Sequence, residues 1–258
     1  LFIIKSFKFI KNMNVKGLIK SWIFLLGILF LGHINLYSQS YKPTNTGELI
    51  EHKYYTLSYI EEHEQAEWVH YLLTKDMIEG VAKRKDNFKA DPLVSTGSAS
   101  PKDYVKTGYD RGHLAPAADM KIDDVSMSES FYMTNMSPQA PSFNRGGWKK
   151  IEALVRDWAT EADIYVTVGG ILTKDLKKIG EGVSVPEYFY KIIFNPKNNT
   201  VIAFYTPNSK LVNPIETYVV TVDEIEKITK IDFLSDLKDE LEDEIESSVN
   251  KANWSFDN

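Results

Sequence analysis

The stretch 109–120 concentrates side chains that could carry out acid–base and anion chemistry. Asp110, Arg111 and His113 lie within four positions of one another. An imidazole titrates near neutral pH and can take a proton from water. A guanidinium stays charged, and its planar fork can bind two anionic oxygens. Gly112 separates the last two groups and permits an unusual backbone angle between them.

Hydrolysis of a phosphodiester fits this set of groups. A base must deprotonate water, a cation must neutralise the phosphoryl oxygens, and the departing alkoxide must be stabilised. The residue types favour His113 as the base and Arg111 as the phosphate contact. Because the chain has no cysteine, a metal would be held by His, Asn, Asp or Glu, which suits hard ions such as Mg²⁺ or Mn²⁺.

The run Asp110-Arg111-Gly112-His113, followed by Asn144, Trp148 and Glu152, resembles the DNA/RNA non-specific endonuclease family. These are the ββα-metal nucleases, which include mitochondrial endonuclease G. The similarity extends over residues 54–241. Supporting segments lie at 87–92, 103–104, 185–186, 189–191, 207–208 and 229–234.

The resemblance implies a sugar-non-specific endonuclease that hydrolyses DNA and RNA with one Mg²⁺, for which Mn²⁺ can substitute. His113 would be the general base, and Arg111 would stabilise the pentacovalent phosphate. Asn144 would be the sole direct protein ligand of the metal, whereas Glu152 would hold metal-bound waters. Asn135 would help to position the site.

Two further site residues follow from the resemblance with less direct support. Asp110 would fix the loop and would not react. Relatives often carry an arginine where Asp86 aligns, and Arg84 could replace it by a small shift.

The spacing between Asn144 and Glu152 agrees with their different expected roles. Eight helical residues rise about 12 Å, which is too far for both side chains to bind one ion directly. Helical side chains tilt toward the N-terminus, so Glu152 can reach back to a water shell around an ion at Asn144.

Simpler interpretations of these residues remain open. An Asn before a helix is commonly an N-cap, and Glu152 could be a solvated helix residue. The cluster at 83–85 could be a solvated face or a nucleic-acid contact. A narrower phosphodiesterase acting on single strands or oligonucleotides is an alternative function, as is a non-catalytic nucleic-acid-binding protein with this fold.

The charge distribution places the basic part of the chain at the candidate site. The net charge is −6 over 258 residues, and an acidic balance opposes contact with polyanions. Residues 83–150, however, carry 11 basic and 8 acidic side chains, whereas 39–82 and 151–258 are acidic. The candidate chemistry therefore lies in the one locally basic stretch.

The first forty residues have the pattern of a secretory signal peptide. Five lysines precede the apolar run 22–31, and no acidic residue occurs before Glu48. Cleavage after Ser38 would give a secreted or periplasmic protein with no stable membrane association. An uncleaved N-terminal anchor is the alternative. Removal of residues 1–38 takes away five lysines and no acids, which changes the net charge from −6 to −11.

Hydrophobic periodicity predicts an α+β fold with a mainly antiparallel central sheet flanked by helices. The resemblance to the nuclease family implies, in addition, a ββα-metal finger at the active site. The expected division is a signal peptide at 1–38, a linker at 39–53, the nuclease domain at 54–248 and a tail at 249–258. We expect strands at 56–59, 67–74, 132–135, 164–168, 188–194, 201–206 and 218–222, and helices at 147–160, after Thr221, and across Leu234 to Ile245.

Overall fold

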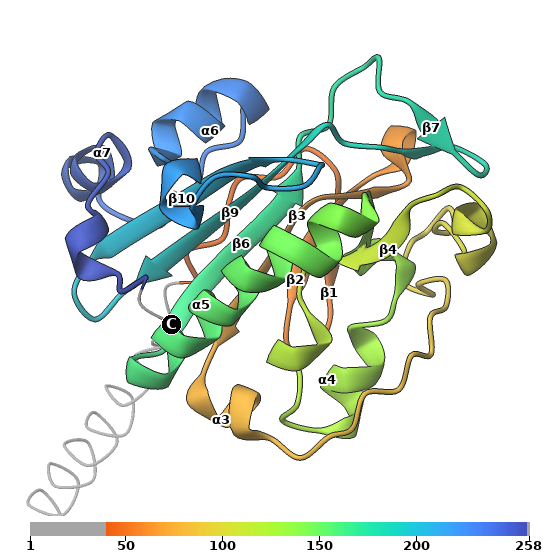
Figure 1. Ribbon diagram of the computed structural model, residues 1–258, viewed down its shortest axis with the longest axis horizontal. Coiled ribbons are helices and arrows are strands. Elements are labelled where there is room, and N and C mark those ends of the chain that lie inside the picture. Colours follow the sequence, from red (N-terminus) through yellow and green to blue (C-terminus); the bar gives the residue numbers. More distant parts are fainter. Residues whose placement is uncertain (1–39, 257–258) are drawn as a thin grey trace, which may run out of the picture. The chain divides into compact units, whose positions relative to one another are not determined.

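A seven-stranded antiparallel sheet forms the centre of the protein (Figure 1). The computed structural model describes residues 40–256, so the expected signal peptide lies outside the described residues. Across the sheet the strands follow the order β1 (Glu48–Glu51), β2 (Thr56–Ile60), β3 (Gln65–Leu73), β6 (Ile164–Gly170), β9 (Tyr188–Asn195), β10 (Thr200–Pro207) and β11 (Val219–Val220), each pair antiparallel.

Side chains from both faces of this sheet are buried, so the sheet lies between two hydrophobic cores. Along β9, Phe189 and Ile193 belong to one core, whereas Tyr190 and Ile192 belong to the other, as the two-residue period of a strand requires. Figure 1 shows α5 (Lys149–Glu161) across one face, with α6 (Val222–Thr229) and α7 (Asp239–Glu246) on the opposite side. The α+β class with flanking helices is therefore confirmed.

Helix α5 (Lys149–Glu161) lies on the sheet through one apolar stripe. Ile151, Val155 and Trp158 recur at spacings of four and three, and all three are buried. This is the pattern of a helix with one face in the core. The same packing fixes Glu152, which directly follows Ile151 and lies near Lys191 of the sheet.

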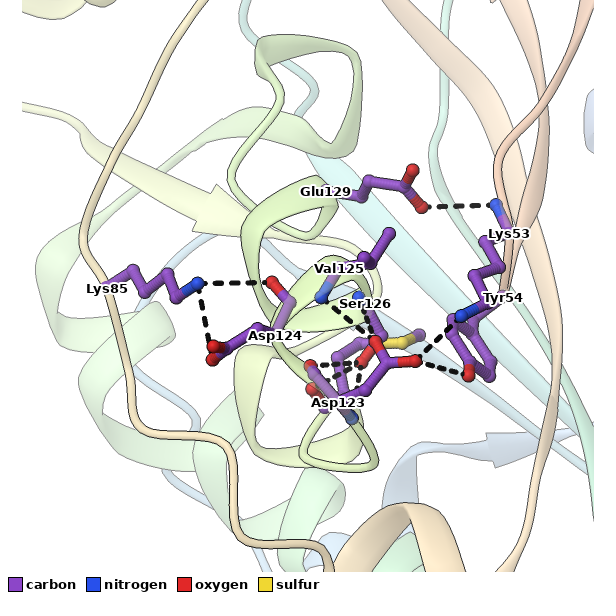
Figure 2. Close-up of polar contacts among 9 residues, drawn as sticks. Lys53, Tyr54, Lys85, Asp123, Asp124, Val125, Ser126 and Glu129 are labelled. Atoms are coloured by element: carbon purple, nitrogen blue, oxygen red, sulfur yellow. Dashed lines mark hydrogen bonds and ion pairs between the residues drawn. The ribbon is translucent and has the colours of Figure 1, made fainter.

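Helix α4 (Asp124–Glu129) is anchored to the segment before β2 by its N-cap (Figure 2). The Asp123 carboxylate accepts hydrogen bonds from two backbone N–H groups of the first turn. It also accepts bonds from Lys53 Nζ at 2.8 Å and from the Tyr54 hydroxyl at 2.7 Å. Two residues after this helix the chain reaches Phe131, which is fully buried and contacts the candidate site.

Two predicted strands differ from the observed structure. Residues 133–135 form a 3-10 turn, and the strand begins only at Met136, because the buried Asn135 side chain bonds backbone groups of another segment. The predicted strand 218–222 is reduced to β11, because Thr221 caps α6 through a capping box with Glu224.

The folded unit also extends beyond its predicted limits. The segment 39–53 was expected to be a linker, yet β1 within it pairs with β2. In the expected C-terminal tail, Trp254 is buried and its ring lies 4.8 Å from that of Trp158. The last long helix is shorter than its apolar spacing predicts, since α7 begins at Asp239 and Leu234 has a φ of 55°.

Two small strand pairs and several short helical turns complete the described chain. They are β4 (Asp110–His113) with β5 (Met136–Gln139), β7 (Lys178–Ile179) with β8 (Val183–Ser184), α3 (Lys75–Glu79), and the turns η2 (Glu61–His63), η3 (Pro101–Tyr104), η4 (Ala117–Asp119), η5 (Met133–Asn135), η6 (Phe143–Trp148), η7 (Ile215–Tyr218) and η8 (Lys251–Asn253).

Candidate active site

Strands β4 and β5 and helix α5 form a ββα unit that carries the candidate residues. In the antiparallel pair, Gly112 lies opposite Ser137 and His113 opposite Met136. A π-helical turn, η6, connects β5 to α5; such turns are frequent at functional sites. Gly112 does not adopt a left-handed backbone angle, although glycine permits one. Its φ is not positive, and glycine is needed because a Cβ there would lie 2.2 Å from the Gln139 side chain.

The imidazole of His113 lies in an aromatic wall. It is 9% exposed, and its ring centroid lies 5.0 Å from that of Phe131 and 5.8 Å from that of Phe88. No described residue hydrogen-bonds its Nε2 atom. Burial, assisted by the charges of Arg84 and Arg111, lowers the pKa of His113 to about 3. The ring is therefore neutral at physiological pH, with a nitrogen free of protein partners.

Both arginines stack on the same aromatic wall. The Arg111 guanidinium lies 4.1 Å from the ring centroid of Phe88, and that of Arg84 lies 5.0 Å from Phe131. Arg84 also pairs with Asp86 through a 2.7 Å contact between Nε and Oδ1. Stacking restricts the orientation of the two guanidinium groups. Both groups still line a cavity and remain accessible to a ligand.

Asp110 orients the side chains at the start of η6. Asn144 Nδ2 donates to its Oδ2 at 2.9 Å, and Arg145 donates to both carboxylate oxygens at 2.8 and 2.5 Å. Although burial opposes it, these hydrogen bonds lower the pKa of Asp110, which keeps the carboxylate ionised. Asn144 is not a helix N-cap, since Ser142 and Trp148 occupy the two N-cap positions.

The amide of Asn144 thus has its nitrogen engaged and its oxygen left as an acceptor. No described residue donates to Asn144 Oδ1. The Glu152 carboxylate shares the same cavity, and no described residue hydrogen-bonds it either. Both are hard oxygen donors, which suits a divalent ion such as Mg²⁺ that keeps several waters. The residues present therefore fit the metal that the resemblance implies.

Beneath Glu152 lies a buried network of opposite charges. Arg156 Nη1 donates to Asp119 Oδ1 at 3.0 Å, and the Tyr71 hydroxyl donates to Asp119 Oδ2 at 2.8 Å. Lys191, on β9, is only 1% exposed. Burial raises the pKa of Glu152 and lowers that of Lys191, while each opposes the shift of the other. The carboxylates of Asp119 and Glu152 thus balance the positive charges of Arg156 and Lys191.

One cavity of about 490 Å³ brings these groups together. Of the predicted site residues it includes Arg84, Arg111, His113, Asn144 and Glu152. Asp110 and Asn135 do not line it. Its remaining lining residues are Pro116, Ala117, Ala118, Arg145, Lys149 and Arg156. Five cationic side chains thus surround a single carboxylate, which is suited to a phosphate-rich ligand.

Asn135 acts on the cavity from a distance. Its side chain is fully buried, accepts from Ala115 N at 2.8 Å, and donates to the carbonyls of Ala115 and Ser130. Its own carbonyl accepts from Leu114 N at 2.9 Å. These bonds fix the backbone that directly follows His113.

Sequence reasoning missed three cationic lining residues and the charges below them. Arg156 could have been found, because it follows Glu152 by four positions on a predicted helix and so lies on the same face. Lys191 stands in an apolar run of a strand buried on both faces, where a lysine requires a partner. Lys149, three positions before Glu152 on the same predicted helix, had the same signal, whereas Arg145 had none.

A ββα unit with His113 and Asn144 in one cationic cavity, packed on a large antiparallel sheet, defines the class of ββα-metal nucleases. The family model for DNA/RNA non-specific endonucleases matches residues 33–240. The chain belongs to this DNA/RNA non-specific endonuclease family.

Individual relatives agree with this assignment. The chain is 36% identical to a nuclease of Nostoc sp., covering 81% of each protein, and 31% identical to the Serratia marcescens nuclease, covering 75% of this chain and 77% of the relative. It is 30% identical to mitochondrial nuclease EXOG of Danio rerio, covering 85% and 77%. Among solved structures, the EndoG/EndoGI complex superposes with a TM-score of 0.68 at 26% identity, covering 75% of this chain and 88% of the other.

Proposed function

We propose that this nuclease hydrolyses the phosphodiester bonds of both DNA and RNA in the cavity around His113, with one Mg²⁺ ion that Mn²⁺ can replace. The observation that carries the proposal is the placement of a neutral histidine with an unpartnered nitrogen beside Arg111 and Arg84 in one cavity. The histidine can take a proton from water, and the two arginines can bind phosphate oxygens. They do not select a base or a sugar.

In this mechanism His113 accepts the proton of the attacking water, and its low pKa keeps it unprotonated for that step. Arg111, with Arg84 and Arg156 on the cavity wall, neutralises the charge that grows on the phosphoryl oxygens. Asn144 Oδ1 would be the direct protein ligand of Mg²⁺, and Glu152 would hold its waters. The bound ion would supply charge stabilisation for the departing oxygen.

Degradation of a supercoiled plasmid and of RNA, with Mg²⁺ and then with EDTA, tests this function. We expect both substrates to be degraded with Mg²⁺ and neither with EDTA. Products from many positions would support non-specific cleavage. A single discrete cut, or turnover unaffected by EDTA, would contradict the proposal.

A narrower phosphodiesterase remains the second candidate, because residues 39–82 and 151–258 carry more acidic than basic side chains. Helix α7 alone carries six acidic residues out of eight, and such a surface repels long polyanions. If this candidate were right, short oligonucleotides would be cleaved faster than plasmid at equal phosphate concentration. Binding of nucleic acid without any cleavage would instead indicate a non-catalytic nucleic-acid-binding protein.

A second cavity of about 490 Å³ lies next to the first and shares Arg145 with it. Lys150 and Lys210 line it together with apolar residues such as Leu211. Asn208 ties its outer loop to β5, since Nδ2 donates to Pro138 O at 3.0 Å. This cavity is suited to nucleotides that flank the scissile phosphate.

We therefore expect a double change, Lys150→Gln with Lys210→Gln, to weaken polynucleotide binding and to reduce its salt dependence. Each lost phosphate contact lowers the slope of log K against log salt by about 0.9 on duplex DNA. Binding of a labelled duplex across a salt series measures the slope. The matched control is Lys174→Gln with Lys197→Gln, two exposed lysines outside both cavities. Equal slopes for the two double variants would contradict this role.

Lys191 is expected to act as a positioning residue through Glu152. Its charge lowers the pKa of Glu152, so Lys191→Met should raise that pKa and leave Glu152 ionised only at higher pH. A rise of about one unit from a pKa of about 7 lowers the ionised fraction of Glu152 at pH 7 about fivefold, so activity should fall by that factor at pH 7 and recover toward pH 9. A pH–rate profile at fixed Mg²⁺ measures the shift, with Lys197→Met as control. An equal loss at every pH would contradict the assignment.

We also propose that the protein is exported, with a mature form that begins near Gln39. The basic and apolar segments of residues 1–38 support this. Among residues 40–256, no helix is long and apolar enough to cross a membrane. N-terminal sequencing of protein from the medium or periplasm should give Gln39-Ser40. Recovery only as an intact membrane-bound chain would contradict export by cleavage.

A further inference from the structure

A second group of oxygen ligands lies on the face of the sheet opposite α5. Asp223 and Glu226 of α6 and Glu246 of α7 each offer a carboxylate oxygen, and these oxygens lie within 4.8 Å of one another. Both helices lie over the core formed by β9 and β10 (Figure 1). None of the three residues lines the catalytic cavity.

Glu246 is the unusual member of this group because it is buried without a partner. The residue is 4% exposed, and no described residue hydrogen-bonds its Oε1 atom. The Oε1 atom of Glu242, one turn earlier on α7, is also buried and unpartnered. A buried carboxylate without a hydrogen-bond donor or a cation is strongly unfavourable, so the arrangement points to a ligand that supplies positive charge.

The surrounding protein does not supply that charge. Among the described residues, no Lys, Arg or His lies within ion-pair distance of these carboxylates. The one donor is Phe233 N, which bonds Glu226 Oε1 at 2.7 Å. Burial, together with the neighbouring carboxylates of Glu226, Glu242, Asp223 and Asp232, raises the pKa of Glu246 to about 9.

Helix α7 itself needs a counter-charge. It reads Asp-Glu-Leu-Glu-Asp-Glu-Ile-Glu, and no basic residue occupies its last turn. Acidic residues near a helix C-terminus oppose the helix dipole, and like charges four residues apart repel each other. Within α7, Ile245 packs against the core of β9 and β10 and is only partly buried.

We propose that Asp223, Glu226 and Glu246 bind a calcium ion that holds α7 against α6. The ligand set contains only oxygen, and Ca²⁺ accepts six to eight oxygens at 2.3–2.6 Å in flexible geometry, including bidentate carboxylates and waters. Mg²⁺ demands a stricter octahedron and loses its waters reluctantly. Asp223 is exposed, so the site opens to solvent at one side and leaves room for coordinated waters. Its role is structural and separate from catalysis.

Calcium binding is measured in the Asn144→Ala background, so that the catalytic metal does not contribute. Calorimetric titration of the calcium-free protein should show one Ca²⁺ per chain, and saturating Ca²⁺ should raise Tm by about 5 °C. Adding Glu246→Gln should remove both effects. Asp223→Asn, at the exposed side of the cluster, should weaken binding at least tenfold and serves as the second variant if Glu246→Gln folds poorly.

The matched control is Glu240→Gln, which removes the same charge from an exposed position of α7 outside the cluster and should bind Ca²⁺ normally. The proposal is overturned if Ca²⁺ neither binds nor stabilises the protein while Glu246→Gln raises Tm without calcium. In that case a proton, and not a metal, neutralises Glu246. Equal binding of Mg²⁺ at the same concentrations would overturn the calcium assignment.

Discussion

Replacement of His113 by alanine is expected to lower turnover on DNA and RNA by a factor of about 10²–10⁴, the usual contribution of a general base. Substrate binding should persist, because the cationic lining of the cavity remains. The fold should persist as well, because Phe88 and Phe131 pack on each other at 4.9 Å without the imidazole. Single-turnover rates and circular dichroism would measure the two effects separately.

The pH dependence of the unmodified enzyme gives a second view of His113. Burial lowers its pKa to about 3, so the imidazole is unprotonated at every pH well above that value. A loss of activity between pH 8 and pH 6 would therefore not arise from His113. Glu152, whose pKa burial raises, would gain a proton in that direction and hold metal-bound water less well. A His113→Ala variant with near-normal rates from pH 6 to pH 9 would exclude His113 as the base.

Replacement of Asn144 by alanine has the second large expected effect. It removes the only direct protein ligand that we propose for Mg²⁺, so metal binding should be lost and excess Mg²⁺ should restore activity poorly. It also removes one hydrogen bond to Asp110, but Arg145 still pairs with that carboxylate. Calorimetric Mg²⁺ titration measures the loss directly.

Glu152→Gln should behave differently, because the side chain keeps its length and one acceptor oxygen. Changes beside a metal's direct ligands typically cost about 10–100-fold in affinity or activity, so high Mg²⁺ should partly restore this variant. Glu161→Gln, an exposed change on the same helix, is its control. Normal Mg²⁺ binding in Asn144→Ala with loss in Glu152→Gln would reverse the two roles.

The sheet could be predicted from the sequence where apolar side chains follow a strong strand pattern. The prediction failed where a side chain hydrogen-bonds distant backbone groups and changes the local conformation. Strands β2, β3, β6, β9 and β10 and helix α5 were expected close to their observed positions. The prediction for 132–135 was wrong because periodicity does not register the long-range bonds of Asn135. At α7, the spacing of Leu234 and Leu237 imitates a helix although both residues precede its first turn.

The candidate site, too, could be predicted only in part from the sequence. Local motifs and the resemblance indicated five of the eleven cavity residues. The pairing of Asp110 with Arg145 and the placement of Lys191 near Glu152 depend on how distant segments meet, so no spacing in the sequence indicates them. The acidic cluster on α6 and α7 was hidden for a different reason. Acidic residues on a helix ordinarily indicate a solvated face, and only the fold reveals that Glu246 is buried.

One preparation assayed on both substrates tests the central claim, that a single cavity hydrolyses DNA and RNA. Initial rates on plasmid and on RNA would be measured for the unmodified protein and for His113→Ala, under identical Mg²⁺ and salt. The account predicts that both rates fall together by a common factor of about 10²–10⁴, and that unlabelled RNA competes with cleavage of DNA. Loss of one activity with retention of the other, or no competition between the substrates, would contradict it.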